Sequence, residues 1–156
     1  MRQFEIATKE VDGKRVPAFN NVKFPVYKTA YAAGCDLFCA EDTVIPAHGL
    51  GRVHTGLKMC MEENDVLLLY NRSSNPSKRG LVLANGVGVV DADYYGNPDN
   101  DGEIMMEFYN ITDKDVVINA GDTIGQAVLT NFIHPASGYT IVNKKRTGGF
   151  GSTDKE

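Results

Sequence analysis

The chain of 156 residues has no tryptophan, few cysteines, no long apolar run and no excess of positive charge. No apolar stretch approaches the roughly 18 residues of a membrane-spanning helix, and the opening MRQFEIATKE lacks the apolar region of a secretory signal. Lysine and arginine number 16 against 20 aspartate and glutamate, which gives a net charge of −4. Because proteins that coat DNA or RNA are usually basic, we expect no nucleic-acid partner. The missing apolar run predicts no membrane association. A small anionic ligand is still compatible with locally concentrated positive charge.

Cysteine and histidine are too few and too scattered for a metal or disulfide framework. The three cysteines are Cys35, Cys39 and Cys60, and an odd number without a signal sequence favours reduced thiols in a cytoplasm. Residues 35 and 39 of one strand would lie about 13 Å apart, beyond disulfide reach. The histidines show no zinc-like spacing. We therefore expect a cytoplasmic protein, or one in the host cytoplasm if it is phage-encoded.

Apolar stretches with helical period and more than ten residues are also absent. Runs of four to eight apolar or β-branched residues recur instead, each followed by a turn signal, and 16 glycines fall at short intervals. About a dozen short strands in one domain predict an all-β sandwich or a jelly-roll-like barrel. The strands are expected at Phe4–Ala7, Val22–Tyr27, Cys35–Cys39, Thr43–Ile45, Gly51–Met61, Val66–Tyr70, Leu81–Ala84, Val87–Val90, Glu103–Asn110, Val116–Ile118, Thr123–Phe132 and Tyr139–Val142.

Two shorter features complete the expected domain. One helical turn fits residues 75–80, and no repeat or linker divides the chain. The barrel is expected to span residues 1–142. Residues 143–156 are polar and glycine-rich, which predicts a mobile C-terminal segment unless a ligand orders it.

The segment NGVGVVDADYYG, residues 85–96, imitates two well-known loops but fits neither. A dinucleotide fingerprint would need glycine where Asp91 stands and a helix afterwards. A calcium loop would need a ligand at Gly102 and flanking helices. What remains is a β-hairpin with polar ends, which is either a solvated turn or a carboxylate base beside an aromatic platform, Tyr94.

Three other segments carry polar groups that suit phosphate. NRSSNPSKRGL places Arg72, Ser73 and Ser74 after a strand, as a phosphate-binding turn or as a capped surface turn whose arginine pairs with an acid. In RTGGFGSTDKE, Arg146, three nearby glycines and two hydroxyls also suit phosphate binding. Phe150 would be exposed there unless it covers a ligand. The alternative is a disordered tail. Gln126 is polar within an apolar strand, and an outward side chain explains it most simply.

In combination these segments resemble a known family. AGCDLF (33–38), NRSS (71–74), NGVGVVDADYYG (85–96), GDTIGQ (121–126) and RTGGFGST (146–153) follow one another as the five motifs of the homotrimeric dUTP pyrophosphatases (dUTPases) do. Each motif alone is weak, but five in order at similar spacing are specific. The resemblance implies hydrolysis of dUTP to dUMP and pyrophosphate by attack of water at the α-phosphorus. It also implies Mg²⁺ as cofactor and a homotrimer with shared sites. The catalytic barrel (1–142) would be followed by a flexible C-terminal segment, 143–156, that closes as a lid.

The resemblance also assigns roles to residues of this chain. Asp91 would activate water, Gln126 would bind near the α-phosphate, and Asp36 would organise the metal-bound triphosphate through water. Tyr94 would pack on the deoxyribose and leave no room for a 2′-hydroxyl. The remaining expected substrate contacts are Arg72, Ser73, Ser74, Asn85, Val87, Gly88, Arg146, Phe150, Gly151, Ser152 and Thr153, with residues 85–88 reading uracil, Phe150 over the base and the arginines and hydroxyls on phosphates.

The chain departs from the family pattern at three places. Ser74 stands where the second motif usually has glycine, which matters only if its backbone must reach positive φ. Asp154 follows Thr153 in place of glycine, and a carboxylate near a γ-phosphate would weaken closure of the tail. The segment YGNPDNDG, residues 95–102, is longer than in the family's shortest members. This variant resembles enzymes of Gram-positive bacteria and their phages.

Two rival functions share the fold or the motifs. A dCTP deaminase can contain an R-S-S stretch, but it uses a glutamate near the base, and residues 81–96 offer Asp91 and no glutamate. A regulatory nucleotide-binding protein that contacts a repressor is the second rival, since phage dUTPases can bind repressors. Some of those proteins carry a domain-like insertion, which the short stretch 96–102 does not match.

Overall fold

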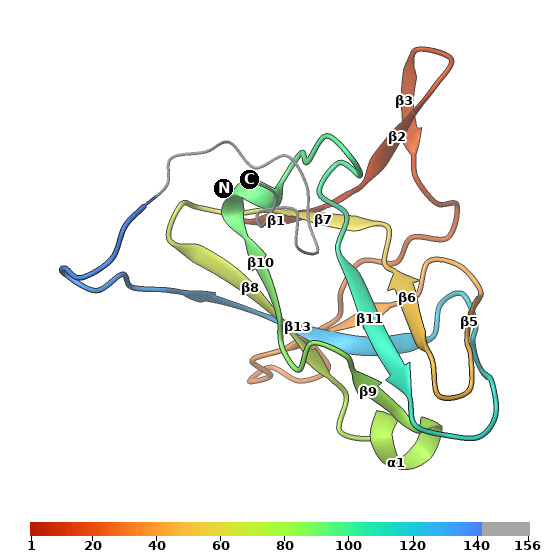
Figure 1. Cartoon of the computed structure of the whole chain (residues 1–156). Coiled ribbons are helices and arrows are strands. Elements are labelled where there is room, and N and C mark those ends of the chain that lie inside the picture. The colour runs from red at the N-terminus through yellow and green to blue at the C-terminus, as the bar shows by residue number, and fades with distance from the viewer. Residues whose placement is uncertain (142–156) are drawn as a thin grey trace.

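The computed structural model describes residues 1–141, and its short strands form the expected all-β, jelly-roll-like barrel (Figure 1). One helical turn, α1 (Asn75–Arg79), closes one end as predicted. Over this range no helix is long and apolar enough to reach across a bilayer. The strands are β1 (Gln3–Ile6), β2 (Thr8–Val11), β3 (Lys14–Pro17), β4 (Cys35–Phe38), β5 (Thr43–Ile45), β6 (Leu50–His54), β7 (Leu57–Cys60), β8 (Asp65–Asn71), β9 (Leu81–Leu83), β10 (Gly88–Asp91), β11 (Met105–Asn110), β12 (Val116–Ile118) and β13 (Thr123–Asn131).

Two sheets enclose the core. One has the strand order β10-β8-β13-β4 and the other β6-β11-β9. Alternation along each strand directs every second side chain inward. On β11 the predicted apolar face is confirmed, because Met106 and Phe108 are buried together with the preceding Ile104. Each such side chain contributes about 1.5–3 kcal/mol of burial free energy, so the core fixes which strand faces remain outside to carry function.

Several expected strands differ from the observed ones. Val22–Tyr27 is not a strand and forms only an isolated bridge between Val26 and Asp36, because Pro25 has no N–H for a ladder. Gly51–Met61 is two strands, β6 and β7, separated at Gly56, whose φ is +68°. Within Tyr139–Val142, residues 139–141 form no strand, and residue 142 lies outside the described range, as does the expected lid 143–156.

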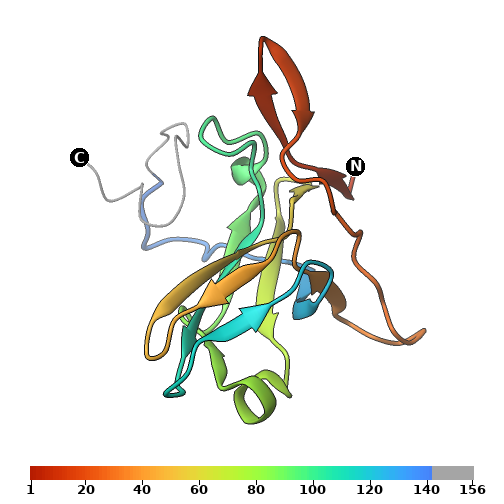
Figure 2. The same ribbon diagram turned by 90° about the vertical axis from the view of Figure 1, so that its right-hand side faces the viewer.

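A hairpin of β2 and β3 was missed by the sequence reasoning. It projects from the barrel in both views (Figures 1 and 2). Its turn residues, Asp12 and Gly13, have φ of 50° and 73°, as the favoured two-residue hairpin turn requires. The Asp-Gly pair between two short runs is the sequence signal that could have identified it.

Candidate active site

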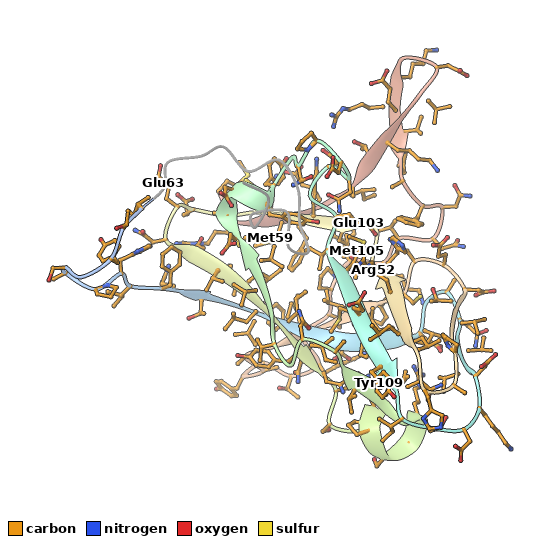
Figure 3. All side chains as sticks on the ribbon, in the orientation of Figure 1. Arg52, Met59, Glu63, Glu103, Met105 and Tyr109 are labelled. Atoms are coloured by element: carbon orange, nitrogen blue, oxygen red, sulfur yellow. The ribbon has the colours of Figure 1, made fainter. Side chains whose placement is uncertain are left out.

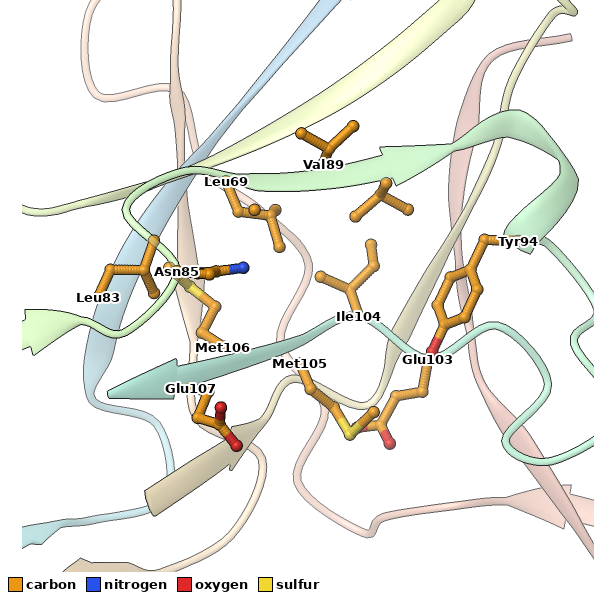
Figure 4. A pocket seen from close by; sticks show the side chains of 12 residues that line it. Leu69, Leu83, Asn85, Val89, Tyr94, Glu103, Ile104, Met105, Met106 and Glu107 are labelled. Atoms are coloured by element: carbon orange, nitrogen blue, oxygen red, sulfur yellow. The ribbon is translucent and has the colours of Figure 1, made fainter. Parts of the chain in front are cut away.

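A pocket of about 180 Å³ lies between the turn after β9, strand β10 and strand β11. Its floor is apolar, from Leu69, Ile104 and Met106, and its polar groups stand around that floor (Figure 4). The pocket brings together three of the predicted substrate contacts, Asn85, Gly88 and Tyr94. A Cβ at position 88 would lie 2.9 Å from the Leu69 Cβ, so glycine keeps this wall thin. The cavity therefore offers an apolar surface bordered by amide and main-chain groups.

The segment 85–96 is not the expected hairpin of two paired strands. Strand β9 pairs with β11, whereas β10 pairs with β8. The turn between them is held by the Gly86 N–H, which donates to the Leu83 carbonyl at 3.0 Å, and by the Val87 N–H, which donates to the Asn85 carbonyl at 2.8 Å. Asn85 and Val87 are exposed at this turn. The correction matters because the turn links the two sheets across the pocket, so its position is fixed by both.

Tyr94 ends a single 3-10 turn, Ala92–Tyr94, directly after β10. Its side chain is 8% exposed and its ring forms one wall of the pocket (Figure 4). The Asn100 Nδ2 donates a hydrogen bond to the Tyr94 Oη at 2.8 Å. Asn100 was not among the predicted site residues, because the contact depends on a loop whose path the sequence does not specify.

Two glutamates also line the pocket, and the sequence analysis missed both. Glu103 accepts the Gly56 N–H at 3.0 Å and lies 3.0 Å from His54 Nδ1, while Glu107 accepts from Arg52 Nη2 at 3.1 Å. The hydrogen bond to Glu103 raises the pKa of His54 above its ordinary value, although burial opposes this. Figure 3 shows Glu103 at the end of β11 away from Tyr109, and Arg52 lies opposite Glu107 on β6. Both carboxylates are thus already engaged by protein groups.

The segment Asn71–Ser74 forms a tight turn between β8 and α1. The Asn71 Oδ1 accepts from the Arg72 N–H at 2.9 Å and from Asn75 Nδ2 at 2.7 Å, and Asn75 Nδ2 also donates to the Ile124 carbonyl at 2.8 Å. Asn75 is 2% exposed, so these amides form an internal support for the turn. Sequence reasoning missed this support, although two asparagines four residues apart around a turn are a recognisable signal.

The turn answers two questions that the sequence left open. Ser74 has φ −86°, so the place where the family usually has glycine needs no left-handed backbone here. Within residues 1–141, Arg72 forms no ion pair with any carboxylate, which argues against the reading of a turn neutralised by an acid. Arg72 and Ser74 are half-buried and Ser73 is exposed. Their guanidinium and hydroxyl groups are thus accessible to an anion.

Gln126 and Asp36 face each other across β13 and β4, level with Tyr70 on β8. They lie on the outer face of the sheet, because their neighbours Cys35 and Ala127 point into the core. The Gln126 Nε2 donates to the Asn71 carbonyl at 3.4 Å, which ties it to the turn Asn71–Ser74. A Cβ at Gly34 would lie 2.8 Å from Gln126 Oε1, so this glycine makes room for the amide.

Asp91 shares that outer face but lies far from Gln126 along the sheet. Asp91 pairs with Val66 at the start of β8, whereas Gln126 pairs with Tyr70 near its end. Four residues of strand span about 13 Å and two interstrand steps about 10 Å, which places the two Cα atoms about 16 Å apart. Asp91 instead borders a second cavity of about 500 Å³ with Met61, Glu63, Ala92, Asp93 and Phe132.

The described residues therefore divide the predicted site into three places: the pocket with Asn85, Gly88 and Tyr94; the cavity with Asp91; and the end of β8, where Asp36, Arg72, Ser73, Ser74 and Gln126 gather. The predictions for Arg146, Phe150, Gly151, Ser152 and Thr153 lie outside the described residues 1–141.

Comparison with known proteins gives a consistent result. The dUTPase family model matches residues 20–154. The deoxyuridine 5′-triphosphate nucleotidohydrolase of Lactococcus lactis subsp. lactis is 40% identical over 153 residues, which are 98% of this chain and 97% of that protein.

Solved structures agree in fold. A dUTPase crystal structure from Streptococcus mutans has a TM-score of 0.76 and 42% identity, and the match covers 86% of this chain and 98% of that one. A mutant dUTPase from phage phi11 of S. aureus, which coordinates a structural Mg(II) ion, has a TM-score of 0.69 at 21% identity, over 92% of this chain and 97% of that one. The motifs, the barrel and the full-length relatives lead to one conclusion: this chain belongs to the dUTPase family.

Proposed function

We propose that the chain hydrolyses dUTP to dUMP and pyrophosphate by attack of water at the α-phosphorus. The observation that carries this proposal is the pocket of about 180 Å³, in which Asn85, Gly88 and Tyr94 surround an apolar floor in a chain of the dUTPase family. An apolar floor suits a flat pyrimidine, and a few polar groups at its border supply orientation and specificity.

Uracil is selected by the polar border of the pocket. Its pairing edge presents acceptor, donor and acceptor in sequence, which the Asn85 amide and the main-chain groups around Val87 and Gly88 can complement. Cytosine presents a different order of donors and acceptors, so its binding would leave polar groups unpaired. Tyr94 packs against the deoxyribose and occupies the space that a 2′-hydroxyl would need.

The phosphate chain is bound by the groups at the end of β8. Arg72, Ser73 and Ser74 offer a guanidinium fork, hydroxyls and turn amides, and Gln126 binds beside the α-phosphate. These groups favour the triphosphate because its negative charge needs neutralising before water can attack.

Mg²⁺ fits this half of the site as an ion shared with the substrate. Within residues 1–141 no three His, Cys, Asp or Glu side chains gather as a metal cage, and Asp36 is a single carboxylate. Mg²⁺ typically keeps several waters and binds one or two carboxylates together with substrate phosphates. Asp36 would hold it through water, and the ion, when bound, supplies positive charge to the triphosphate.

Asp91 acts as the base that takes a proton from the attacking water, while pyrophosphate leaves. Asp91 and Gln126 must then approach the same water and phosphate. Their Cα atoms lie about 16 Å apart in one chain, and the two side chains together do not span that distance. We infer a homotrimer in which Asp91 of one chain meets Gln126 and Arg72 of another, and in which residues 146–153 complete the site. We also infer that the protein works in a cytoplasm.

The dCTP deaminase reading is not favoured. Residues 81–96 contain no glutamate, whereas Glu103 and Glu107 do line the pocket. Both are held by protein partners, Glu103 by His54 and the Gly56 N–H and Glu107 by Arg52. Neither carboxylate is thus available as a proton shuttle without breaking these contacts.

A direct assay tests the proposal. Release of pyrophosphate and ammonia is measured from dUTP and from dCTP, with and without Mg²⁺. We expect Mg²⁺-dependent pyrophosphate release from dUTP and little of either product from dCTP. Ammonia release from dCTP, or no turnover of dUTP with Mg²⁺, would contradict the proposal.

A further inference from the structure

The loop Tyr95–Gly102 follows Tyr94 and returns to it. We propose that Asn100 is a positioning residue for Tyr94, and that this loop exists to hold the ring that discriminates deoxyribose from ribose. The inference rests on the proposed role of Tyr94 in contacting the sugar. It concerns a residue outside the five motifs, in the segment that is longer than in the family's shortest members.

Asn100 is fixed by three hydrogen bonds. Its Nδ2 donates to the Tyr94 Oη at 2.8 Å and to the Glu103 carbonyl at 3.4 Å, and its Oδ1 accepts the Gly102 N–H at 3.1 Å. The Gly102 N–H can only donate, so it requires the amide oxygen on its side. The NH₂ group therefore points to the phenol oxygen, and the orientation of this amide is determined by its neighbours.

The loop also closes on the backbone of Tyr94. The Asn97 N–H donates to the Tyr94 carbonyl at 3.1 Å, and the Asp101 N–H donates to the Asn97 carbonyl at 2.7 Å. Gly102 has φ +80°, and a Cβ there would lie 2.5 Å from the Tyr94 carbonyl oxygen. Only glycine allows the loop to approach so closely. The ring is consequently held at both ends, by its own backbone and by Asn100 at the phenol.

Asp101 anchors this loop to the barrel and to the hairpin of β2 and β3. The Asp101 Oδ2 accepts from Lys58 Nζ at 2.8 Å and from Thr8 Oγ1 at 2.7 Å, and the Asp101 Oδ1 accepts from Arg15 Nη1 at 2.9 Å. The Asp101 side chain is 5% exposed. Burial would raise the pKa of this carboxyl, but the hydrogen bonds from Lys58, Thr8 and Arg15 outweigh burial and lower the pKa to about 2. The loop is thus a supported element and not a free excursion.

This support has a functional consequence. A pocket wall rejects one added hydroxyl only modestly, because a ring that tilts can make room for it. Discrimination by exclusion therefore improves when the excluding side chain is locked by packing and by hydrogen bonds from neighbouring residues. Asn100 supplies the hydrogen bond that prevents the Tyr94 ring from tilting at its outer end.

The experiment compares dUTP with UTP. The ratio of kcat/KM for the two substrates is measured in the wild type, Asn100→Ala, Tyr94→Phe and the double variant, with Asp99→Ala as a control in the same loop. Loss of one neutral hydrogen bond should lower the ratio about 2- to 10-fold in Asn100→Ala, chiefly through a lower KM for UTP. Tyr94→Phe should match it, because it removes the accepting oxygen and keeps the ring. The double variant should lose no more than either single one, and Asp99→Ala should keep the wild-type ratio.

Two other outcomes overturn the inference. Additive losses in the double variant, or a wild-type ratio in Tyr94→Phe, would show that the Asn100–Tyr94 bond does not carry discrimination, and Tyr94→Phe decides this even if Asn100→Ala fails to fold. Tyr94→Ala separates this failure from that of the proposed site. If Tyr94→Ala lowers the ratio and Asn100→Ala does not, only the positioning role is lost; if Tyr94→Ala leaves it unchanged, the sugar contact itself is wrong.

Discussion

The two halves of the site are built differently. The pocket with Tyr94 is internally supported: Asn100 holds the phenol, and Asp101 ties the loop to three strands. At the end of β8, Ser73 is exposed and Arg72 is half-buried, and Asn75 and Gln126 support the turn through Asn71. A neutral base and sugar need a pre-shaped cavity, whereas a flexible, charged triphosphate needs accessible positive charge. We therefore propose that one chain supplies the recognition half, and that groups from other chains help to close the phosphate half.

The largest effect should come from Asp91, which borders a separate cavity and is proposed to act as the base. Asp91→Asn keeps the shape and removes the base, so we expect kcat to fall at least about 100-fold with little change in KM. Steady-state kinetics on dUTP measure this, and Asp93→Asn, two residues away, serves as the control. Near-normal kcat in Asp91→Asn would remove Asp91 from the mechanism.

The stability of the fold at low pH tests the support that Asp101 gives to the loop beside Tyr94. Removing the Asp101 charge leaves the buried Lys58 without its partner, so Asp101→Asn should lower the free energy of unfolding at pH 7 by about 3 kcal/mol. The pKa of Asp101 is lowered to about 2 in the folded state. Its contribution is therefore present above about pH 4 and is lost as the pH falls toward 2. Urea unfolding at several pH values checks this, and equal stability of Asp101→Asn and Asp99→Asn at pH 7 would refute it.

Sugar selection tests the pocket directly. Tyr94→Ala opens the space beside the sugar, so the preference for dUTP over UTP should fall by about 10- to 100-fold. Parallel kcat/KM measurements with both nucleotides give the ratio. An unchanged preference would mean that sugar selection lies elsewhere in the site.

The smallest effect concerns His54 beside the pocket. Its pKa is raised by the hydrogen bond to Glu103, so the folded state favours the protonated imidazole. The resulting stability is fully present below the unfolded pKa of about 6.5 and is lost as the pH rises through the higher folded value. We expect less than about 1 kcal/mol from this pair. His54→Gln should remove the corresponding pH dependence of Tm; an identical dependence in the variant would exclude His54 as its source.

The sequence predicted those features that depend on local pattern. Alternation identified β11 and its buried face, and the motif segments identified Asn85, Gly88 and Tyr94, which the fold brings into one pocket. The supporting contacts were not predictable in this way. Lys58 meets Asp101 across 43 positions and Thr8 meets Asp101 across 93, so these pairs depend on tertiary packing. The same holds for Glu103, whose carboxylate is buried against His54 and Gly56.

The central claim is that Asp91 and the phosphate-binding residues of one working site come from different chains. Asp91→Asn and Arg72→Ala are each expected to be inactive; the two proteins are mixed in equal amounts, unfolded, refolded together, and assayed for dUTP hydrolysis. In a closed cyclic trimer with shared sites, about a quarter of the sites receive both intact residues, so activity should return to roughly that fraction of wild type. If a tag pull-down proves that the chains have mixed and activity stays at the level of the separate variants, the sites are not shared and the account is contradicted.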